Sequence, residues 1–76
     1  MWHELTPGYA CFMRAMGDCF CQVYQLNPHV WRWEVRRWHD RLARFNLERL
    51  GTEPALAQAF AAAEGYVEAS QKPAPS

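Results

Sequence analysis

The sequence lacks net charge, long hydrophobic runs and any signal-peptide pattern. Eight Lys and Arg residues balance eight Asp and Glu residues, so the overall charge does not indicate a nucleic acid or an anionic membrane as the partner. No apolar run approaches the roughly 20 residues that a membrane-spanning helix needs. No charged segment followed by an apolar one marks the N-terminus as a signal peptide. We therefore expect a cytoplasmic protein without a membrane partner.

The sequence also lacks the paired cysteines of a disulfide framework or a zinc site. Three cysteines are an odd number, which fits reduced thiols. Cys19 and Cys21 are separated by one residue, which is tighter than the two to four residues usual between zinc ligands, and no second pair follows. We expect these thiols to be small buried hydrophobic groups and predict no metal site.

Motifs of catalysis are missing as well. The sequence contains no nucleophile elbow, no glycine-rich phosphate loop and no metalloprotease box. Its three histidines are scattered in the N-terminal segment and in expected turns, where a solvated histidine is ordinary. We predict no catalytic residue and no cofactor, and therefore a protein that is not an enzyme.

What is present is a single small domain rich in large aromatic side chains. The 76 residues are 50% hydrophobic and include four Trp, four Phe and three Tyr, which favours a folded chain with a small aromatic core. We place this domain at residues 1–69. Residues 70–76 contain two prolines and no apolar anchor, and we expect a disordered tail there.

Three segments show the alternation of β-strands. Residues 30–38 place Trp31, Trp33 and Val35 on one face and charged residues on the other, which is typical of a half-buried strand. Residues 19–26 also predict a strand, but they carry apolar groups on both faces, which is typical of a central strand or of one covered on both sides. Asn27-Pro28 marks the turn between the two strands. A third strand is expected over residues 41–49, after a turn at His39-Asp40.

Two helices are expected around these strands. Thr6-Pro7 is typical of a helix start, and Tyr9, Phe12, Met13 and Met16 follow at helical spacing, which predicts a helix over residues 7–16. The alternative is an extended segment from Tyr9 to Met13.

The second helix is predicted over residues 53–69, after Leu50-Gly51 ends the sheet and Thr52 caps the helix. This segment is rich in alanine, and its apolar stripe comprises Leu56, Phe60, Ala63 and Val67.

These elements predict an α+β fold in the order αβββα, a three-stranded antiparallel meander with both helices on one face. The core should combine residues from the strands and the second helix: Trp31, Trp33, Val35, Phe45, Leu47, Leu56, Phe60 and Val67. The opposite sheet face should show Arg32, Glu34, Arg36, Arg44 and Glu48, with Trp38 at its edge.

The strongest candidate site is this arginine-rich sheet face. Six of the seven arginines lie within residues 30–49, together with only three acidic residues. Arg32, Arg36 and Arg44 could bind phosphates or an acidic protein surface, and Trp38 could anchor an interface or stack on a base. The alternative is an ordinary solvated face on which Glu34 and Glu48 pair with the arginines.

Two resemblances extend these expectations. The predicted element order and Asn27-Pro28-His29 resemble the double-stranded-RNA-binding domain in outline, but residues 52–57 lack the lysine cluster with which that family grips phosphates. The topology is thus implied without that RNA-binding mode.

Residues 31–64 carry W-x-W-x-V, a basic hairpin and G-T-x-P-x-L-A-x-A-x-A-A-A-E. They look like small phage and prophage proteins that pair a hairpin with an Ala-rich helix, some of which are anti-CRISPR or other host-takeover inhibitors. This resemblance implies a small phage-type inhibitor that docks on a host protein complex and blocks it in the host cytoplasm. The alternatives are a nucleic-acid-binding module that uses the arginine-rich face and a self-associating structural protein. Pairing at the sheet edge could also join two copies as a homodimer.

Overall fold

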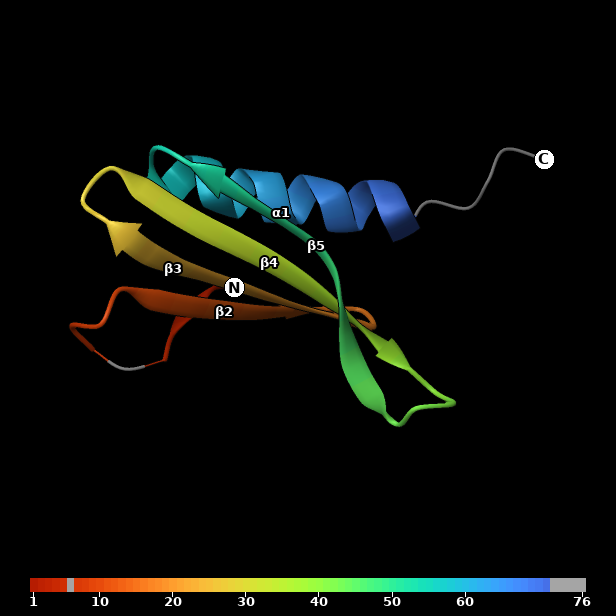
Figure 1. The fold of residues 1–76 in the computed structure, drawn as a ribbon. Helices are drawn as coiled ribbons and strands as arrows, with labels where there is room; N and C mark the ends of the chain where they lie inside the picture. The colour runs from red at the N-terminus through yellow and green to blue at the C-terminus, as the bar shows by residue number, and fades with distance from the viewer. Residues whose placement is uncertain (6, 72–76) are drawn as a thin grey trace.

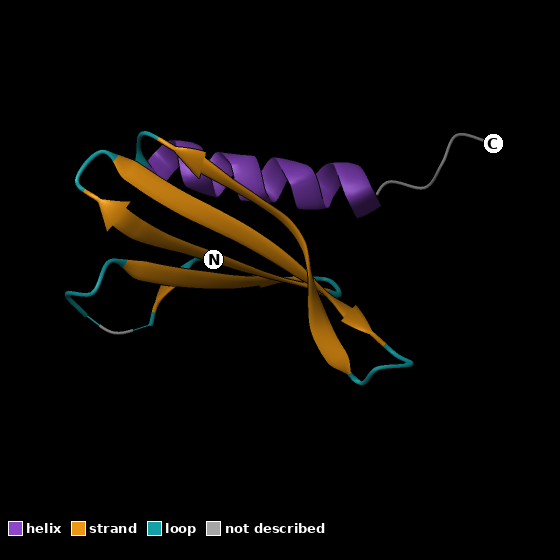
Figure 2. Cartoon of the chain, in the orientation of Figure 1, coloured by secondary structure: helices purple, strands orange, loops and turns teal. Residues whose placement is uncertain are grey.

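The computed structural model describes residues 1–5 and 7–71, which form an antiparallel sheet and one C-terminal helix (Figure 1, Figure 2). The five strands are neighbours in chain order, so the sheet is a simple meander. Their bounds are β1 His3–Glu4, β2 Cys11–Met16, β3 Cys19–Asn27, β4 Val30–His39 and β5 Arg44–Glu53, and helix α1 is Leu56–Gln71. The predicted three-stranded meander with two helices is therefore wrong, although the α+β class stands.

The expected first helix is the strand β2. Its residues pair with β3 from Cys11 opposite Tyr24 to Met16 opposite Cys19, and Gly17, with a positive φ of 61°, joins the two strands. The expected extended alternative is closer, because Cys11 to Met13 are strand residues, whereas Tyr9 lies in the preceding turn. Thr6, the proposed helix cap, lies outside the described residues. This correction also removes the element order on which the resemblance to the RNA-binding domain rests.

The strands predicted over residues 19–26 and 30–38 are confirmed, each ending one residue later than expected. The turn between them is also confirmed. In it, the backbone N–H of His29 donates a 2.9 Å hydrogen bond to Oδ1 of Asn27. An Asn side chain often closes such a turn.

The last strand lies further along the chain than predicted. Four residues separate the paired residues His39 and Arg44, and β5 continues through Gly51 and Thr52, which were expected to end the sheet and cap the helix. Within β5 the pairing skips Glu48, because Val35 lies opposite Arg49 and Arg36 lies opposite Leu47. Such an extra residue is a β-bulge, which reverses the alternation of the side chains beyond it.

The bulge overturns the predicted core positions Phe45 and Leu47. Gly51 and Arg49 of β5 face inward, because they lie opposite the buried Trp33 and Val35. Phe45 and Leu47 are therefore on the opposite side of the sheet and are 45% and 47% exposed.

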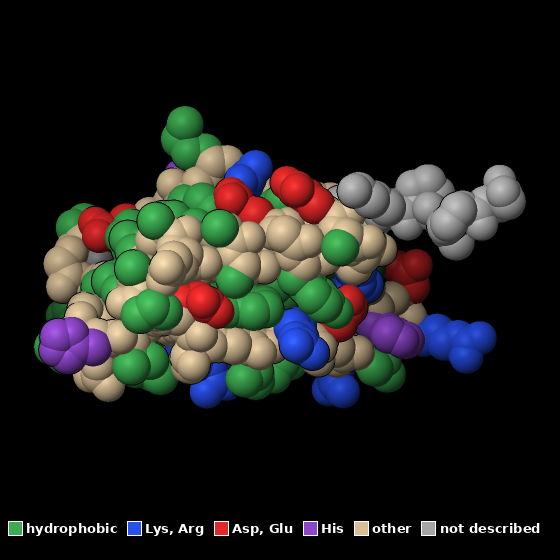
Figure 3. Space-filling model, turned by 90° about the horizontal axis from the view of Figure 1, so that it is seen from above, with side chains coloured by type: hydrophobic (Ala, Val, Ile, Leu, Met, Phe, Trp, Pro, Cys, Tyr) green, Lys and Arg blue, Asp and Glu red, His purple; other side chains and the backbone are tan. Residues whose placement is uncertain are grey.

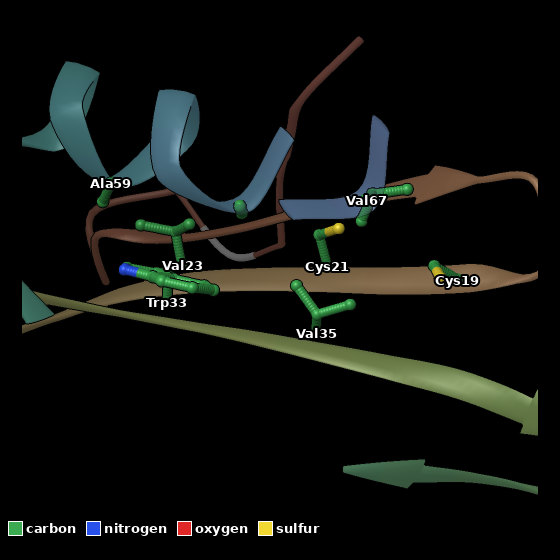
Figure 4. Close-up of a cluster of buried hydrophobic side chains, with 8 residues drawn as sticks. Cys19, Cys21, Val23, Trp33, Val35, Ala59 and Val67 are labelled. Carbon is green, nitrogen blue, oxygen red and sulfur yellow. The ribbon is translucent and has the colours of Figure 1, made fainter. Parts of the chain in front are cut away.

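The core lies between α1 and the inner face of the sheet (Figure 4). Ala59, Ala63 and Val67 of the helix face β3 and β4, whose buried hydrophobic residues are Cys19, Cys21, Val23, Trp33 and Val35. Because the buried helix residues are small, the helix can lie close to the strands.

The predicted stripe on the second helix is confirmed, with Leu56 and Phe60 packed at the margin of this core. The helix also includes Ser70 and Gln71, which were expected to begin the tail. The rest of that tail, 72–76, lies outside the described residues.

Gly51 is required by the packing of one core side chain. A Cβ added at this position would lie 2.7 Å from Cε2 and Nε1 of Trp33, so the indole ring occupies the space of the missing side chain. Gly65 in α1 is the matched opposite case, because a Cβ there would meet no atom within 4 Å.

We predict that Gly51→Ala lowers the free energy of unfolding by about 1–3 kcal/mol, because Trp33 must move from its packed position. Gly65→Ala should raise it by about 0.5–1 kcal/mol, because alanine favours the helix. Urea denaturation followed by tryptophan fluorescence measures both changes. Equal effects of the two substitutions would contradict the contact between Gly51 and Trp33.

Candidate functional site

The sheet has one face that no described helix covers, which we call the outer face. Helix α1 lies on the inner face, against β3, β4 and part of β5. Strand register then places on the outer face the side chains that alternate with the core residues. Those of the three long strands are Phe20, Gln22, Tyr24, Arg32, Glu34, Arg36, Trp38, Phe45, Leu47, Leu50 and Thr52.

An apolar group lies at one part of this face, and we call it the outer patch: Phe20, Trp38, Phe45, Leu47 and Leu50. The ring centroid of Phe45 lies 5.3 Å from that of Trp38 and 5.9 Å from that of Phe20, so the three rings form one cluster. Leu47 follows on the same face, opposite Arg36, and Leu50 lies opposite Glu34. Trp38, Phe45, Leu47 and Leu50 are each between 41% and 47% exposed. A cluster of partly exposed aromatic and aliphatic side chains is typical of an interaction surface.

Beside the outer patch lies a buried carboxylate, Glu34, which is only 5% exposed. The hydroxyl of Tyr24 donates a 2.7 Å hydrogen bond to Oε2 of Glu34, and Arg36 donates a short one to Oε1. Nε of Arg32 lies 2.9 Å from Oε2, but it makes no hydrogen bond within the described residues, so this contact is an ion pair alone. Three side chains thus enclose one carboxylate on an otherwise open face.

These contacts decide the charge of Glu34. Burial alone would raise the pKa of its carboxyl, but the hydrogen bonds from Tyr24 and Arg36 and the charges of Arg36 and Arg32 outweigh it, and the pKa lies below its ordinary value. The hydroxyl of Tyr24 has a raised pKa, because it is partly buried and donates to this carboxylate. Two guanidinium groups therefore surround one ionised carboxylate, and this part of the outer face carries one excess positive charge.

The structure brings together three of the four predicted site residues. Arg32, Arg36 and Trp38 lie on the outer face, as their alternation in β4 predicts. Arg44 does not join them, because it pairs with His39 and its Nε donates to Asn46 on the opposite side of the β4–β5 hairpin. The site therefore lacks Arg44 and gains the apolar side chains of Phe45 and Leu47, which were expected in the core.

Glu48, like Arg44, was predicted to lie on the arginine-rich face, and this prediction is wrong. As the extra residue of the bulge, it accepts hydrogen bonds from Arg37 and from the hydroxyl of Tyr66 on α1, which lower the pKa of its carboxyl. Arg37 also binds Asp18 and Ser70, so this guanidinium fastens the hairpin to the helix end. Figure 3 views the molecule from above Figure 1, from the side of α1, and there charged groups of both signs are interspersed with apolar ones.

The cysteines on the inner face belong to the core. Cys19 and Cys21 are buried, and burial is the main reason why the pKa of Cys19 is raised and that of Cys21 reaches about 11. No three His, Cys, Asp or Glu side chains in residues 1–5 and 7–70 are grouped as metal ligands, and this part of the molecule has no pocket.

No helix in the described part of the chain has the length and apolar character needed to cross a membrane.

Comparison with protein-family models, curated protein sequences and solved structures found no significant match. The outer face must therefore be interpreted from its own chemistry.

We predict that Glu34→Gln destabilises the protein at neutral pH by about 1–3 kcal/mol, because two arginines lose the carboxylate that they share. The folded-state pKa of Glu34 is lowered, so its contribution is fully present above the ordinary value of 4.5 and is lost as the pH falls through the lower folded value. The difference in stability between the wild type and Glu34→Gln should thus shrink below pH 4.5.

Urea denaturation of both proteins between about pH 7 and about pH 3 measures this difference. The matched control is Glu68→Gln, which changes an exposed carboxylate that makes no ion pair with another described residue. A difference that stayed constant over this range would show that Glu34 is not held ionised by its neighbours.

Proposed function

We propose that this chain is a non-catalytic protein-binding module, which docks through its outer face on an acidic, partly apolar surface of another protein. The observation that carries this proposal is the position of the outer patch beside Arg32 and Arg36 on a face that no described helix covers. Docking there would occlude the bound surface, and occlusion requires neither a cofactor nor a catalytic residue.

The apolar part of the face supports a protein partner. Binding energy in protein interfaces is concentrated in aromatic and arginine side chains near the centre of the contact. The outer patch offers Trp38 and Phe45 in contact with each other, and Arg36 lies beside Leu47. These side chains are already held in place, so a partner would have little ordering entropy to offset.

The charged part supports an acidic partner. Arg32 and Arg36 share only Glu34, and both guanidinium side chains remain about one-third exposed, at 32% and 33%. A carboxylate of the partner would meet this excess positive charge without burying an unpaired ion, which is the costly outcome at interfaces.

A nucleic acid is less well supported as the partner. Phosphate binding requires cations that are free to contact a backbone of regularly spaced charges. Here Arg37 is paired with Asp18 and Glu48, and Arg44 lies on the other side of the hairpin from the outer patch. The remaining outer-face arginines already share a carboxylate.

The narrower role is that of a phage-type inhibitor, such as an anti-CRISPR protein, that blocks a host protein complex in the cytoplasm. This role rests on the resemblance of residues 31–64 to small phage proteins. Trp38, Arg32 and Arg36 would make the contact, whereas Arg44, on the other side of the hairpin, would lie outside it.

We predict that the wild-type protein, immobilised and exposed to nuclease-treated bacterial lysate, retains a protein with an acidic surface at moderate salt. Trp38→Ala and Leu47→Ser should each weaken binding to that protein, once purified, by at least about tenfold, because they remove apolar anchors. Calorimetric titration of the purified pair measures this change.

The control is Tyr9→Ala, which removes an aromatic side chain that is 76% exposed and lies outside the outer face. It should bind like the wild type. Equal binding by all variants would overturn the assignment of the outer face. In a parallel capture from untreated lysate, retention of nucleic acid alone, with nothing retained from the nuclease-treated lysate, would replace the protein partner with a nucleic acid.

A further inference from the structure

Strand β5 is a long edge strand whose second side has no strand partner in the described chain. It has ten residues and ends the sheet order, whereas the opposite edge, β1, has only two residues (Figure 1). The backbone N–H and C=O groups on its free side are available to another strand. Edge strands of this length usually carry a feature that prevents or directs such pairing.

The bulge places Leu47 and Leu50, which lie on either side of it, on the same face of the sheet. Residues three apart in a regular strand point to opposite faces, yet Leu47 and Leu50 both lie on the outer face because Glu48 is the extra residue between them. Phe45 and Leu47 face outward before the bulge, and Leu50 and Thr52 face outward after it. Residues at equal distances on either side of the point between Glu48 and Arg49 therefore have their side chains on the same face of the sheet.

We propose that two copies of this chain associate through β5, antiparallel, about a twofold axis that passes between Glu48 and Arg49. In this register each copy's Leu47 lies opposite Leu50 of the second copy, and Phe45 lies opposite Thr52, all on the outer face. Asn46 lies opposite Gly51 on the inner face. Each of these facing pairs is thus on a common side of the joined sheet, as an antiparallel ladder requires.

The charges on β5 match this register. Arg44 lies opposite Glu53 of the second copy, and Glu48 lies opposite Arg49, so the twofold axis produces four pairs of opposite charge. Arg49 makes no ion pair with a described residue of its own chain, and Glu53 accepts only a 3.3 Å hydrogen bond from Nε1 of Trp33. Opposite charges directly across a strand pair stabilise it, and like charges destabilise it.

Neighbouring registers lose this agreement. A shift by one residue that placed Arg49 opposite Arg49 would bring like charges together and set Leu47 opposite Gly51, on the other face. A shift by two residues would place Arg44 opposite Gly51, and Leu47 would no longer lie opposite Leu50 of the second copy. The pattern of β5 therefore favours a second copy of the same strand over a strand of unrelated sequence.

This association can be tested without any partner protein, and so separately from the docking function. Sedimentation velocity of the purified chain over roughly 1 µM to roughly 1 mM should show a mass that rises from the monomer toward twice that value, since weak interfaces have dissociation constants in this range. The monomer has a mass of 8.9 kDa. A mass that stayed monomeric at every concentration would overturn the proposal.

Charge exchange tests the register. Arg44→Glu alone or Glu53→Arg alone should remain monomeric at concentrations where the wild type is dimeric, because each places like charges opposite each other twice. An equimolar mixture of the two variants should form a heterodimer, because all its pairs are then of opposite charge. This rescue separates the interface from a folding defect, which mixing would not repair.

The matched control is Arg41→Glu, which makes the same charge change in the exposed turn before β5 and should dimerise like the wild type. Dimerisation of Arg44→Glu at the wild-type concentration would place the contact elsewhere and overturn the β5 register. Failure of the mixture to associate would overturn it equally.

Discussion

A single helix can cover only one face of a five-stranded sheet, and this constraint determines the rest of the structure. The core is one layer between α1 and the inner face, built from small helix residues against Cys21, Val23, Trp33 and Val35. The other face has no second layer in the described chain. It must therefore be satisfied by its own side chains, by solvent or by another molecule.

The charged part and the apolar part of the outer face differ in how their side chains are satisfied without a covering layer. At its charged part, Glu34 is enclosed by Tyr24, Arg32 and Arg36, so that a carboxylate with 5% exposure has its partners on the same face. At its apolar part, Phe45 and Leu47 retain nearly half of their exposure. The buried network fixes the arginine side chains at defined positions, and the apolar cluster supplies area that gains free energy when water leaves it.

The sequence predicted the elements that depend on local patterns. The predictions were wrong where the structure depends on pairing between strands. The helix and the strands β3 and β4 follow from an alanine-rich stripe, strict alternation and the Asn27 turn. In β2, Phe12, Met13 and Met16 satisfy helical spacing, but pairing with β3 overrides it. Arg32, Arg36 and Trp38 were placed correctly by alternation, whereas Arg44 was not, because the bulge at Glu48 reverses the facing of residues 44–47 relative to residues 49–53. The spacing of Leu47 and Leu50, three residues apart, was the available signal of the bulge.

The bulge at Glu48 connects the two surfaces that this fold leaves open. It turns Phe45 and Leu47 onto the outer face, which creates the outer patch, and it gives β5 the symmetric facing that a twofold pairing needs. In the paired arrangement the leucines of the two copies would meet and join the two outer patches into one continuous apolar surface. A partner with twofold symmetry could then contact both patches at once, and the second contact would be intramolecular. Modest affinity at each outer face would suffice for tight binding of such a partner.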